Sequence, residues 1–251
     1  DGDSDLFVGG GSLPGRYPLS SRSALFENRS GTFVMLQSQL EIFSHLSLVT
    51  DVASGDMNGD GAEDLVVAQE WGSIGVFLNR AGVFEDSTKV MGLSQYSGLW
   101  QCAHLADVNG DGRKDIIAGN FGNNTVYATY PLPVRLSYLD LQGQETVGAL
   151  EFHYDKDLGD WFPTRKYNVA TAAFPTMRHR IPTSRRYASM SMEQILGDQF
   201  QISKHREINF LNSVIFFNEG GTFSVQGLPD KIAHSPVFGV CSGDFNGDNN
   251  D

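Results

Sequence analysis

The chain has 251 residues, a charged-residue content of 19% and a net charge of −12 at pH 7. A phosphate backbone requires clustered Lys and Arg, so this acidic balance argues against nucleic acid as a partner. No apolar stretch approaches the roughly 20 residues that span a bilayer, so no membrane span is predicted. The length suits one all-β domain with a sizeable core.

An acidic motif recurs along the chain and is best preserved at residues 56–64, where the sequence is DMNGDGAED. Oxygen-bearing side chains stand at alternate positions between two glycines, which suits a hard cation with about six to eight oxygen ligands, Ca²⁺ before Mg²⁺. An EF-hand loop starts similarly but needs an acidic ligand at its twelfth position and a following helix. Here the twelfth position is Val67, within a β-branched run typical of a buried strand. The pattern therefore predicts a calcium loop between two strands.

Further copies of this loop are found, and residues 107–115 repeat it in full. Residues 1–5 and 244–251 hold partial copies, and we expect both ends to be cut from a longer protein. We predict structural Ca²⁺ at two complete sites and up to two partial ones. The predicted metal ligands are Asp56, Asn58, Asp60, Ala62 (carbonyl), Asp64, Asp107, Asn109, Asp111, Arg113 (carbonyl), Asp115, Asp1, Asp3, Asp5, Asp244, Asn246, Asp248 and Asn250.

A second motif, an apolar run followed by Asn-x-x-Gly and Phe, occurs at residues 25–33, 76–84 and 215–223. Each copy is typical of a β-hairpin. Its phase with the acidic loops is nearly constant, because 27 residues separate Phe33 from Asp60 and also Phe84 from Asp111. One period thus predicts a four-stranded antiparallel blade, and such blades in series form a β-propeller.

Residues 120–212 break this rhythm. A fourth loop begins at Asp140, but Gln142, Gln144 and Gly148 stand at ligand positions, so we expect it to bind no metal. Prolines and a capping-box pattern at residues 191–194 predict short helices further on. We therefore predict an all-β fold in one domain, residues 1–251: a partial or few-bladed β-propeller of four-stranded antiparallel blades with a short helical insertion. The expected blades are at about 1–50, 51–100, 101–133 and 134–234, with the insertion at about 168–212 and a further blade starting at 235–251.

The repeated loops, with Phe238-Gly239 ahead of the last one, resemble the FG-GAP and VCBS repeats known from integrin α subunits. The stretch 5–18, containing DLFVGG and PGRYP, and the Pro-rich segment 174–196 are similar to propeller proteins of the cartilage-acidic-protein and UnbV-associated type. The resemblance implies a propeller of commonly about seven blades, calcium binding, an extracellular or periplasmic setting, and a role in binding or cell adhesion.

Other candidate sites are less specific. Four carboxylates near Trp161 could form a paired-acid sugar site, although a charged turn anchored by the Trp is the simpler interpretation. These are Glu151, Asp155, Asp157 and Asp160. The basic residues within 178–186 could bind an anionic polysaccharide or an acidic partner, or form the solvated face of short helices. Cys102 and Cys241 are expected to be buried free thiols.

We expect a secreted calcium-stabilised propeller that presents a face, including the helical insertion, to a protein or carbohydrate. No nucleophile elbow, P-loop or dinucleotide fingerprint is present, so no catalytic or cofactor-binding residue is predicted. The alternative is a carbohydrate-active enzyme, since some polysaccharide lyases are built on calcium-bearing propellers and a fold does not fix a function. A passive spacer within a larger adhesin is a third possibility.

Overall fold

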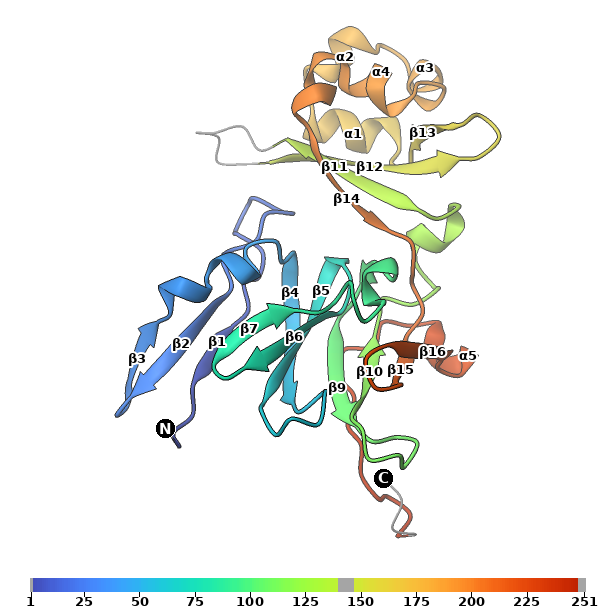
Figure 1. The fold of residues 1–251 in the computed structure, drawn as a ribbon. Helices are drawn as coiled ribbons and strands as arrows, with labels where there is room; N and C mark the ends of the chain where they lie inside the picture. Colours follow the sequence, from blue (N-terminus) through green and yellow to red (C-terminus); the bar gives the residue numbers. More distant parts are fainter. Residues whose placement is uncertain (1, 140–146, 248–251) are drawn as a thin grey trace. The chain divides into compact units, whose positions relative to one another are not determined.

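The computed structural model describes residues 2–139 and 147–247. The chain divides into two compact units (Figure 1). Unit 1 is Asp1–Gly11, Ser20–Asn124 and Leu211–Asp251, and unit 2 is Ser12–Leu19 and Thr125–Phe210. The two expected regular patterns, repeated blades and short helices, therefore fall in different units. None of the described helices is long and apolar enough to cross a membrane.

Unit 1 contains three antiparallel sheets that follow one another along the chain. The first has the order β1 (Leu6–Val8), β2 (Ala24–Arg29), β3 (Thr32–Met35). The second has the order β4 (Leu48–Gly55), β5 (Asp64–Gly72), β6 (Gly75–Arg80), β7 (Val83–Asp86), with β8 (Gly98–Leu99) paired to β5. The third has the order β9 (Cys102–Ala106), β10 (Asp115–Gly119), β15 (Val214–Asn218), β16 (Phe223–Gly227).

Short helical turns connect these strands. They are the 3₁₀ turns η1 (Gln37–Gln39), η2 (Glu41–Phe43) and η3 (Leu93–Gln95), and the helix α5 (Asp230–Ala233), whereas the 3₁₀ turn η4 (Val126–Thr129) belongs to unit 2. Of these, η2 places Phe43 in the core between the first two sheets, with its ring 4.9 Å from that of Phe7 and 5.1 Å from that of Phe77. Aromatic packing of this kind closes the space between successive blades.

The Asn-x-x-Gly motifs form hairpins, as predicted. Between β2 and β3, Ser30 and Gly31 have φ of 55° and 89°, and between β6 and β7, Ala81 and Gly82 have φ of 54° and 89°. Two successive positive φ angles give the turn whose twist matches a two-residue hairpin. In the second hairpin, the side-chain oxygen of Asn79 accepts from the backbone N–H of Gly82 at 2.7 Å, which explains the Asn at the start of the motif.

Unit 2 is a four-stranded antiparallel sheet with a layer of short helices on one face (Figure 1). The sheet order is β13 (Asp160–Pro163), β12 (Gly148–Asp155), β11 (Val134–Leu139), β14 (Lys204–Ile208). The helices are α1 (Tyr167–Ala173), α2 (Met177–Arg180), α3 (Ser184–Ala188) and α4 (Met192–Leu196), followed by the 3₁₀ segment η5 (Gly197–Ile202). Ser191 and Gln194 form the predicted capping box at the start of α4. The core lies between sheet and helices, with Phe152, Ile181 and Ile195 almost completely buried.

The fold class is confirmed: the chain is all-β, with antiparallel blades of a partial propeller and a short helical insertion. The predicted blade boundaries in the second half are incorrect. Ile116 of β10 pairs with Phe216 of β15, so the third blade combines residues 102–119 with residues 214–227. Residues 125–210 of unit 2 are inserted between its second and third strands, whereas the prediction ended this blade at residue 133. The expected fourth loop at Asp140 lies outside the described residues, and Gly148 begins β12.

Candidate metal centre

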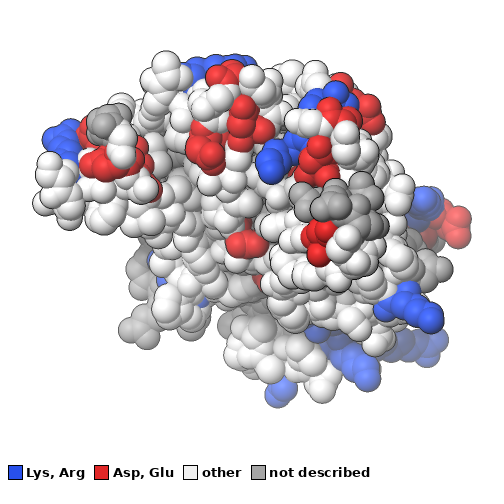
Figure 2. All heavy atoms as spheres, turned by 90° about the horizontal axis from the view of Figure 1, so that it is seen from below, with Lys and Arg blue, Asp and Glu red and all other residues white. Residues whose placement is uncertain are grey.

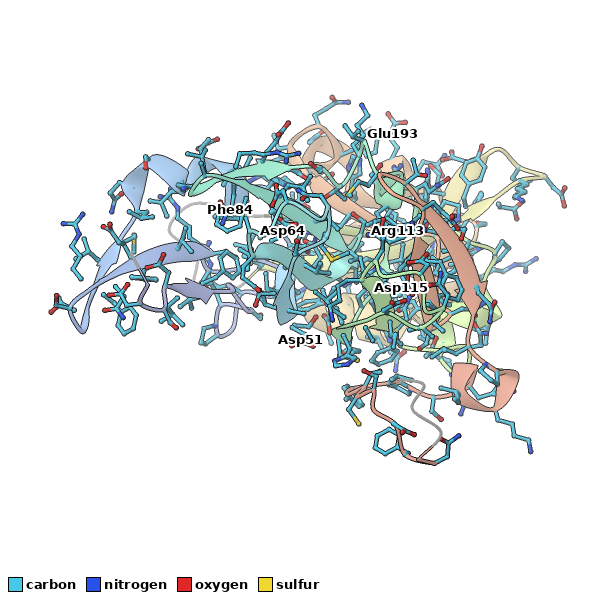
Figure 3. All side chains as sticks on the ribbon, turned by 60° about the horizontal axis from the view of Figure 1, so that its bottom comes forward. Asp51, Asp64, Phe84, Arg113, Asp115 and Glu193 are labelled. Atoms are coloured by element: carbon cyan, nitrogen blue, oxygen red, sulfur yellow. The ribbon has the colours of Figure 1, made fainter. Side chains whose placement is uncertain are left out.

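The two complete acidic motifs both form turns between neighbouring strands of unit 1. Loop 1 (residues 56–64) joins β4 to β5, and loop 2 (residues 107–115) joins β9 to β10. Each loop ends on the first residue of the next strand, Asp64 or Asp115, both labelled in Figure 3. Each loop therefore begins directly after one strand and ends on the antiparallel partner of that strand, which restricts the separation of its first and last carboxylates.

The first carboxylate of each loop organises the turn. In loop 1, Oδ1 of Asp56 accepts from the N–H of Gly59 at 2.7 Å, and Oδ2 accepts from the N–H of Gly61 at 2.8 Å. In loop 2, Asp107 receives the corresponding amides of Gly110 and Gly112 at 2.8 and 2.7 Å. These backbone hydrogen bonds, led by that of Gly61, lower the pKa of Asp56. All four glycines have φ between 75° and 86°, so the turn requires glycine at both positions.

The last carboxylate of each loop is buried and fully engaged by backbone amides. Asp64, with 0% exposure, accepts from Met57 N–H at 2.8 Å and from Asn79 N–H at 2.7 Å. Asp115, also 0% exposed, accepts in the same way from Val108 and Asn218, both at 2.9 Å. One carboxylate thus ties the loop to the hairpin strand of its own blade.

Negative charge accumulates at loop 1. Burial raises the pKa of Asp64, and the nearby carboxylates of Asp60 and Asp56 raise it further. A bound cation would relieve this repulsion, because it favours the ionised form of every carboxylate that it contacts. The face in Figure 2 shows Asp and Glu in several groups, with Lys or Arg beside some of them.

A guanidinium lies against the fifth position of each loop, which the sequence analysis missed. Arg80 Nη1 is 3.1 Å from Asp60 Oδ2, and Arg113 Nη2 is 2.5 Å from Asp111 Oδ2. The backbone N–H of Arg113 lowers the pKa of Asp111, and the side-chain hydrogen bond from Asn109 and the guanidinium charge of Arg113 lower it further. Arg80 and Arg113 both come shortly after Asp or Asn motif residues, but only the fold shows that they return to a carboxylate.

The loops offer an oxygen-only donor set: two carboxylates and an Asn amide at alternate positions, a main-chain carbonyl, and the buried final carboxylate. That chemistry fits Ca²⁺. Among residues 2–139 and 147–247, no three His, Cys, Asp or Glu side chains are grouped so that they alone could hold a metal. The three carboxylates of each complete loop therefore do not form such a group in this structure.

Each partial copy of the motif forms one hydrogen bond that is equivalent to a hydrogen bond of the complete loops. Asp5 Oδ1 accepts from Asn28 N–H at 2.9 Å, as Asp64 does from Asn79. Asp244 Oδ1 accepts from Gly247 N–H at 2.7 Å, as the first Asp of each complete loop does from its Gly. Asp1, Asp248 and Asn250 lie outside the described residues.

The loops also connect neighbouring blades. The side-chain amide of Asn218, at the end of β15, donates to the carbonyl of Met57 in loop 1 at 2.9 Å and to that of Lys114 in loop 2 at 3.1 Å. Arg113 Nε donates to the carbonyl of Asn218 at 2.6 Å. A pocket of about 580 Å³ lies between the two loops and is lined in part by Asp56 and Arg113. The order of loop 1 is therefore coupled to the contact between the second and third blades.

The structure also shows where the other candidate residues of the sequence lie. The paired-acid site does not form: Asp155 accepts the N–H of Asp157 within the β12–β13 turn, and Glu151 binds Arg165 with Nε 2.5 Å from Oε2. Trp161 packs under the guanidinium of Arg135, 3.9 Å from the ring centroid.

Both cysteines are free. Cys102 is buried, and burial raises its thiol pKa, but Cys241 is exposed, contrary to expectation, because residues 238–247 form no strand.

Antiparallel blades whose strands are joined by repeated acidic loops define a partial β-propeller. Residues 1–67 and 56–118 each match the FG-GAP-like repeat. Residues 1–118 thus carry FG-GAP-like repeats, which are propeller modules often used in binding and adhesion. The second match ends within β10, just before residues 125–210 interrupt the third blade. No curated protein matches the chain.

Proposed function

We propose that this chain is a calcium-stabilised propeller module that binds a protein or carbohydrate outside the cytoplasm, as part of a longer secreted protein. The observation that carries the proposal is the repeated geometry of loops 1 and 2. In both, a carboxylate with 0% exposure is held by two backbone amides beside further acidic side chains. Because both loops form the same oxygen-rich turn, a structural cation in each loop explains them better than an ordinary acidic surface does.

The residues proposed to hold the ion are the first, third, fifth, seventh and ninth of each loop. In loop 1 these are Asp56, Asn58, Asp60, the carbonyl of Ala62, and Asp64. When bound, Ca²⁺ supplies positive charge that offsets three carboxylates at the corner of a blade. The carboxylate of Asp64 orients the corner by accepting from the backbone N–H groups of Met57 and Asn79, and Asn218 links loop 1 to the next blade.

Thermal unfolding with Ca²⁺ and with a chelator tests this proposal. Extracellular calcium modules have dissociation constants on the order of 10⁻⁴ to 10⁻³ M. At a hundred times the dissociation constant, each site would add about 2.7 kcal/mol to the free energy of unfolding. The melting temperature should therefore rise with Ca²⁺ and fall with chelator, and calorimetric titration should give two sites. An identical melt in both buffers would remove calcium from the proposal.

The finer proposal is a protein of the cartilage-acidic-protein and UnbV-associated type. It is supported by the motifs within residues 5–18 and by the short Pro-rich helices around α2 to α4. The sequence flanking these residues in the complete protein is the test, because this type would continue the blade pattern in both directions.

A second candidate function, cleavage of an acidic polysaccharide, is favoured by one observation. His153, Tyr167 and Tyr187 line the same pocket of unit 2 as Arg165. These are the residue types that eliminative cleavage of a uronic acid would need, as base and as carboxylate partner. Burial raises the pKa of Tyr187, which makes that phenol a poor base near neutral pH. Incubation with acidic polysaccharides, followed by detection of unsaturated products, decides between cleavage and binding alone.

A further inference from the structure

Basic residues are concentrated in one stretch of this acidic chain. Residues 161–192 contain no Asp or Glu, yet the whole chain carries a net charge of −12. The cationic residues of this stretch are Arg165, Lys166, Arg178, Arg180, Arg185 and Arg186. The stretch runs from the end of β13 through α1, α2 and α3 into α4, all within unit 2. Local positive charge in an acidic protein favours an anionic ligand over a solvated face shared with carboxylates.

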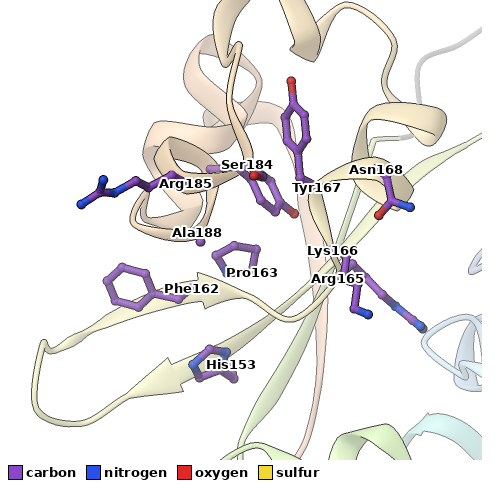
Figure 4. Close-up of a pocket in the computed structure, with 11 residues that line it drawn as sticks. His153, Phe162, Pro163, Arg165, Lys166, Tyr167, Asn168, Ser184, Arg185 and Ala188 are labelled. Atoms are coloured by element: carbon purple, nitrogen blue, oxygen red, sulfur yellow. The ribbon is translucent and has the colours of Figure 1, made fainter.

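Part of this stretch lines a pocket of about 640 Å³ between β13 and the helices α1 and α3 (Figure 4). Phe162 and Pro163 of β13 provide an apolar surface. Lys166 and Arg165 extend on one side of it, and Arg185 extends from α3 on the other. The volume is within the range of about 300 to 1,000 Å³ that is usual for small-molecule sites.

The cationic side chains of the pocket differ in whether they already form an ion pair. Arg165 is already paired with the buried carboxylate of Glu151, and this hydrogen bond raises the pKa of the guanidinium. Lys166 and Arg185 are exposed and have no ion-pair partner among residues 2–139 and 147–247. Two available cations on opposite sides suit a ligand with repeated negative charges more than a single small anion.

Two buried polar atoms of lining residues have no hydrogen-bond partner in the described part of the chain. They are the hydroxyl of Tyr187, whose side chain is only 2% exposed, and Nδ1 of His153. Burial lowers the pKa of His153, so its ring is neutral near pH 7 and adds no charge. A buried polar group without a partner is costly, and a ligand with hydroxyl groups would satisfy both atoms.

We infer that this pocket binds a carboxylate-bearing oligosaccharide, such as a short run of uronic acid residues. Sugar ring faces would lie on Phe162 and Pro163, carboxylates would pair with Lys166 and Arg185, and a sugar hydroxyl would reach Tyr187. The inference rests on the proposed binding function and specifies the ligand class and the unit that holds it. It does not depend on Ca²⁺ in loops 1 and 2.

Titration of the whole chain with a galacturonate hexamer tests this inference, using calorimetry at low salt. We expect saturable binding, and no binding of the fully methyl-esterified hexamer, which has the same rings without charge. Arg185→Gln and Lys166→Gln should each weaken binding about tenfold, as expected for loss of a hydrogen bond to a charged group. The matched control is Arg186→Gln, the adjacent exposed arginine outside the pocket, which should leave affinity within about twofold.

Tyr187→Phe separates a ligand contact from a structural role. The hydroxyl has no partner in the described part of the chain, so its removal should leave the melting temperature unchanged or slightly raised while weakening binding about fivefold. Absence of saturable binding, or equal binding by Arg185→Gln and wild type, would overturn the inference. Equal affinity for a sulfated oligosaccharide without carboxylates would overturn the carboxylate assignment. The calcium melt on the same sample reports the module proposal separately: a calcium response without sugar binding rejects this inference alone.

Discussion

The second and third blades are built on the same corner but are closed very differently. In the second blade, Asp64 reaches the amide of Asn79, which is 15 residues further along the chain. In the third, Asp115 reaches the amide of Asn218, which is 103 residues further. For a flexible connection, each doubling of length would cost only about 0.6 kcal/mol, so the longer closure would cost roughly 2 kcal/mol more. The geometry of a blade corner therefore tolerates a large insertion between its second and third strands.

Unit 2 reduces even that cost through its own sheet. Its first and last strands are neighbours, with Val134 paired to Ile208. The ends of the insertion are thereby held close together before the chain re-enters unit 1. There, Gly122 donates to the carbonyl of Leu211 at 3.0 Å, and Asn123 bonds Asn212 at 2.6 Å. A folded insertion thus acts on the host blade as a short connection.

The largest expected effect comes from the buried corner carboxylate. Asp115→Ala leaves two amides without their acceptor, one of which closes the interrupted blade, so it should lower the free energy of unfolding by about 2 to 5 kcal/mol in chelator. Urea denaturation measures this. Asp64→Ala should cost a similar amount if the two corners are equivalent.

The matched control for both corner variants is Asp157→Ala, in the exposed β12–β13 turn, which should change stability by less than about 0.5 kcal/mol. If Asp115→Ala were as mild as this control, the corner would not hold the third blade closed.

The second effect concerns the metal. Asp60→Ala and Asp111→Ala should each remove the calcium-dependent part of the melting shift that belongs to one loop, about 2.7 kcal/mol at a hundred times the dissociation constant. Asp140→Ala should leave the calcium response unchanged. Differential scanning calorimetry in Ca²⁺ and in chelator measures all three. A full calcium response in both loop variants would contradict the ligand assignment.

A smaller effect distinguishes the blades at the hairpin Asn. Asn218 is 1% exposed and its side-chain N–H groups donate to two carbonyls, including that of Met57 in the neighbouring blade, whereas Asn79 is partly exposed and its side-chain N–H group donates to the carbonyl of Glu63 in its own blade. Asn218→Ala should cost about 2 to 3 kcal/mol and Asn79→Ala about 1 kcal/mol. Equal losses in urea denaturation would mean that the contact between blades adds no stability.

The smallest effect is a pH dependence within the first two blades. The hydrogen bond that the His45 ring donates to Asp86 raises the pKa of His45, whose Nε2 lies 3.1 Å from Asp86 Oδ2. A raised pKa in the folded state stabilises the protein below pH 6.5, the unfolded value, and this stabilisation is lost as pH rises through the folded pKa. The melting temperature should therefore decline slightly between pH 6 and 8, and His45→Gln should flatten that slope. A steeper slope in the variant would exclude this pair as its source.

Local patterns predicted the corners and hairpins because each is specified within a few residues. The glycines of loop 1 need positive φ, and Asn79 bonds the Gly three residues later, so the sequence alone carries both signals. The pairing of β10 with β15 has no such local signal, since about 100 residues lie between the partners. The hairpin at residues 215–223 was recognised but was assigned to the wrong blade for this reason.

The site was predicted to a similar extent. The alternate oxygen ligands follow from spacing, but the guanidinium of Arg80 against Asp60 depends on how the hairpin folds back, 20 residues away. For the pocket of unit 2, the sequence predicts only the basic residues as candidates for binding an anion. The unpartnered hydroxyl of Tyr187 depends on packing between α3 and its neighbours, which no spacing rule describes.

The adjacent positions of β11 and β14 also bear on how such a chain can diversify. Because the insertion leaves the blade and returns to it on neighbouring strands, its interior can be exchanged without altering the register of β10 and β15. The residues that shape the pocket of unit 2 are then different from the residues that build the repeated corners. Ligand preference and scaffold geometry can evolve at different rates within one polypeptide.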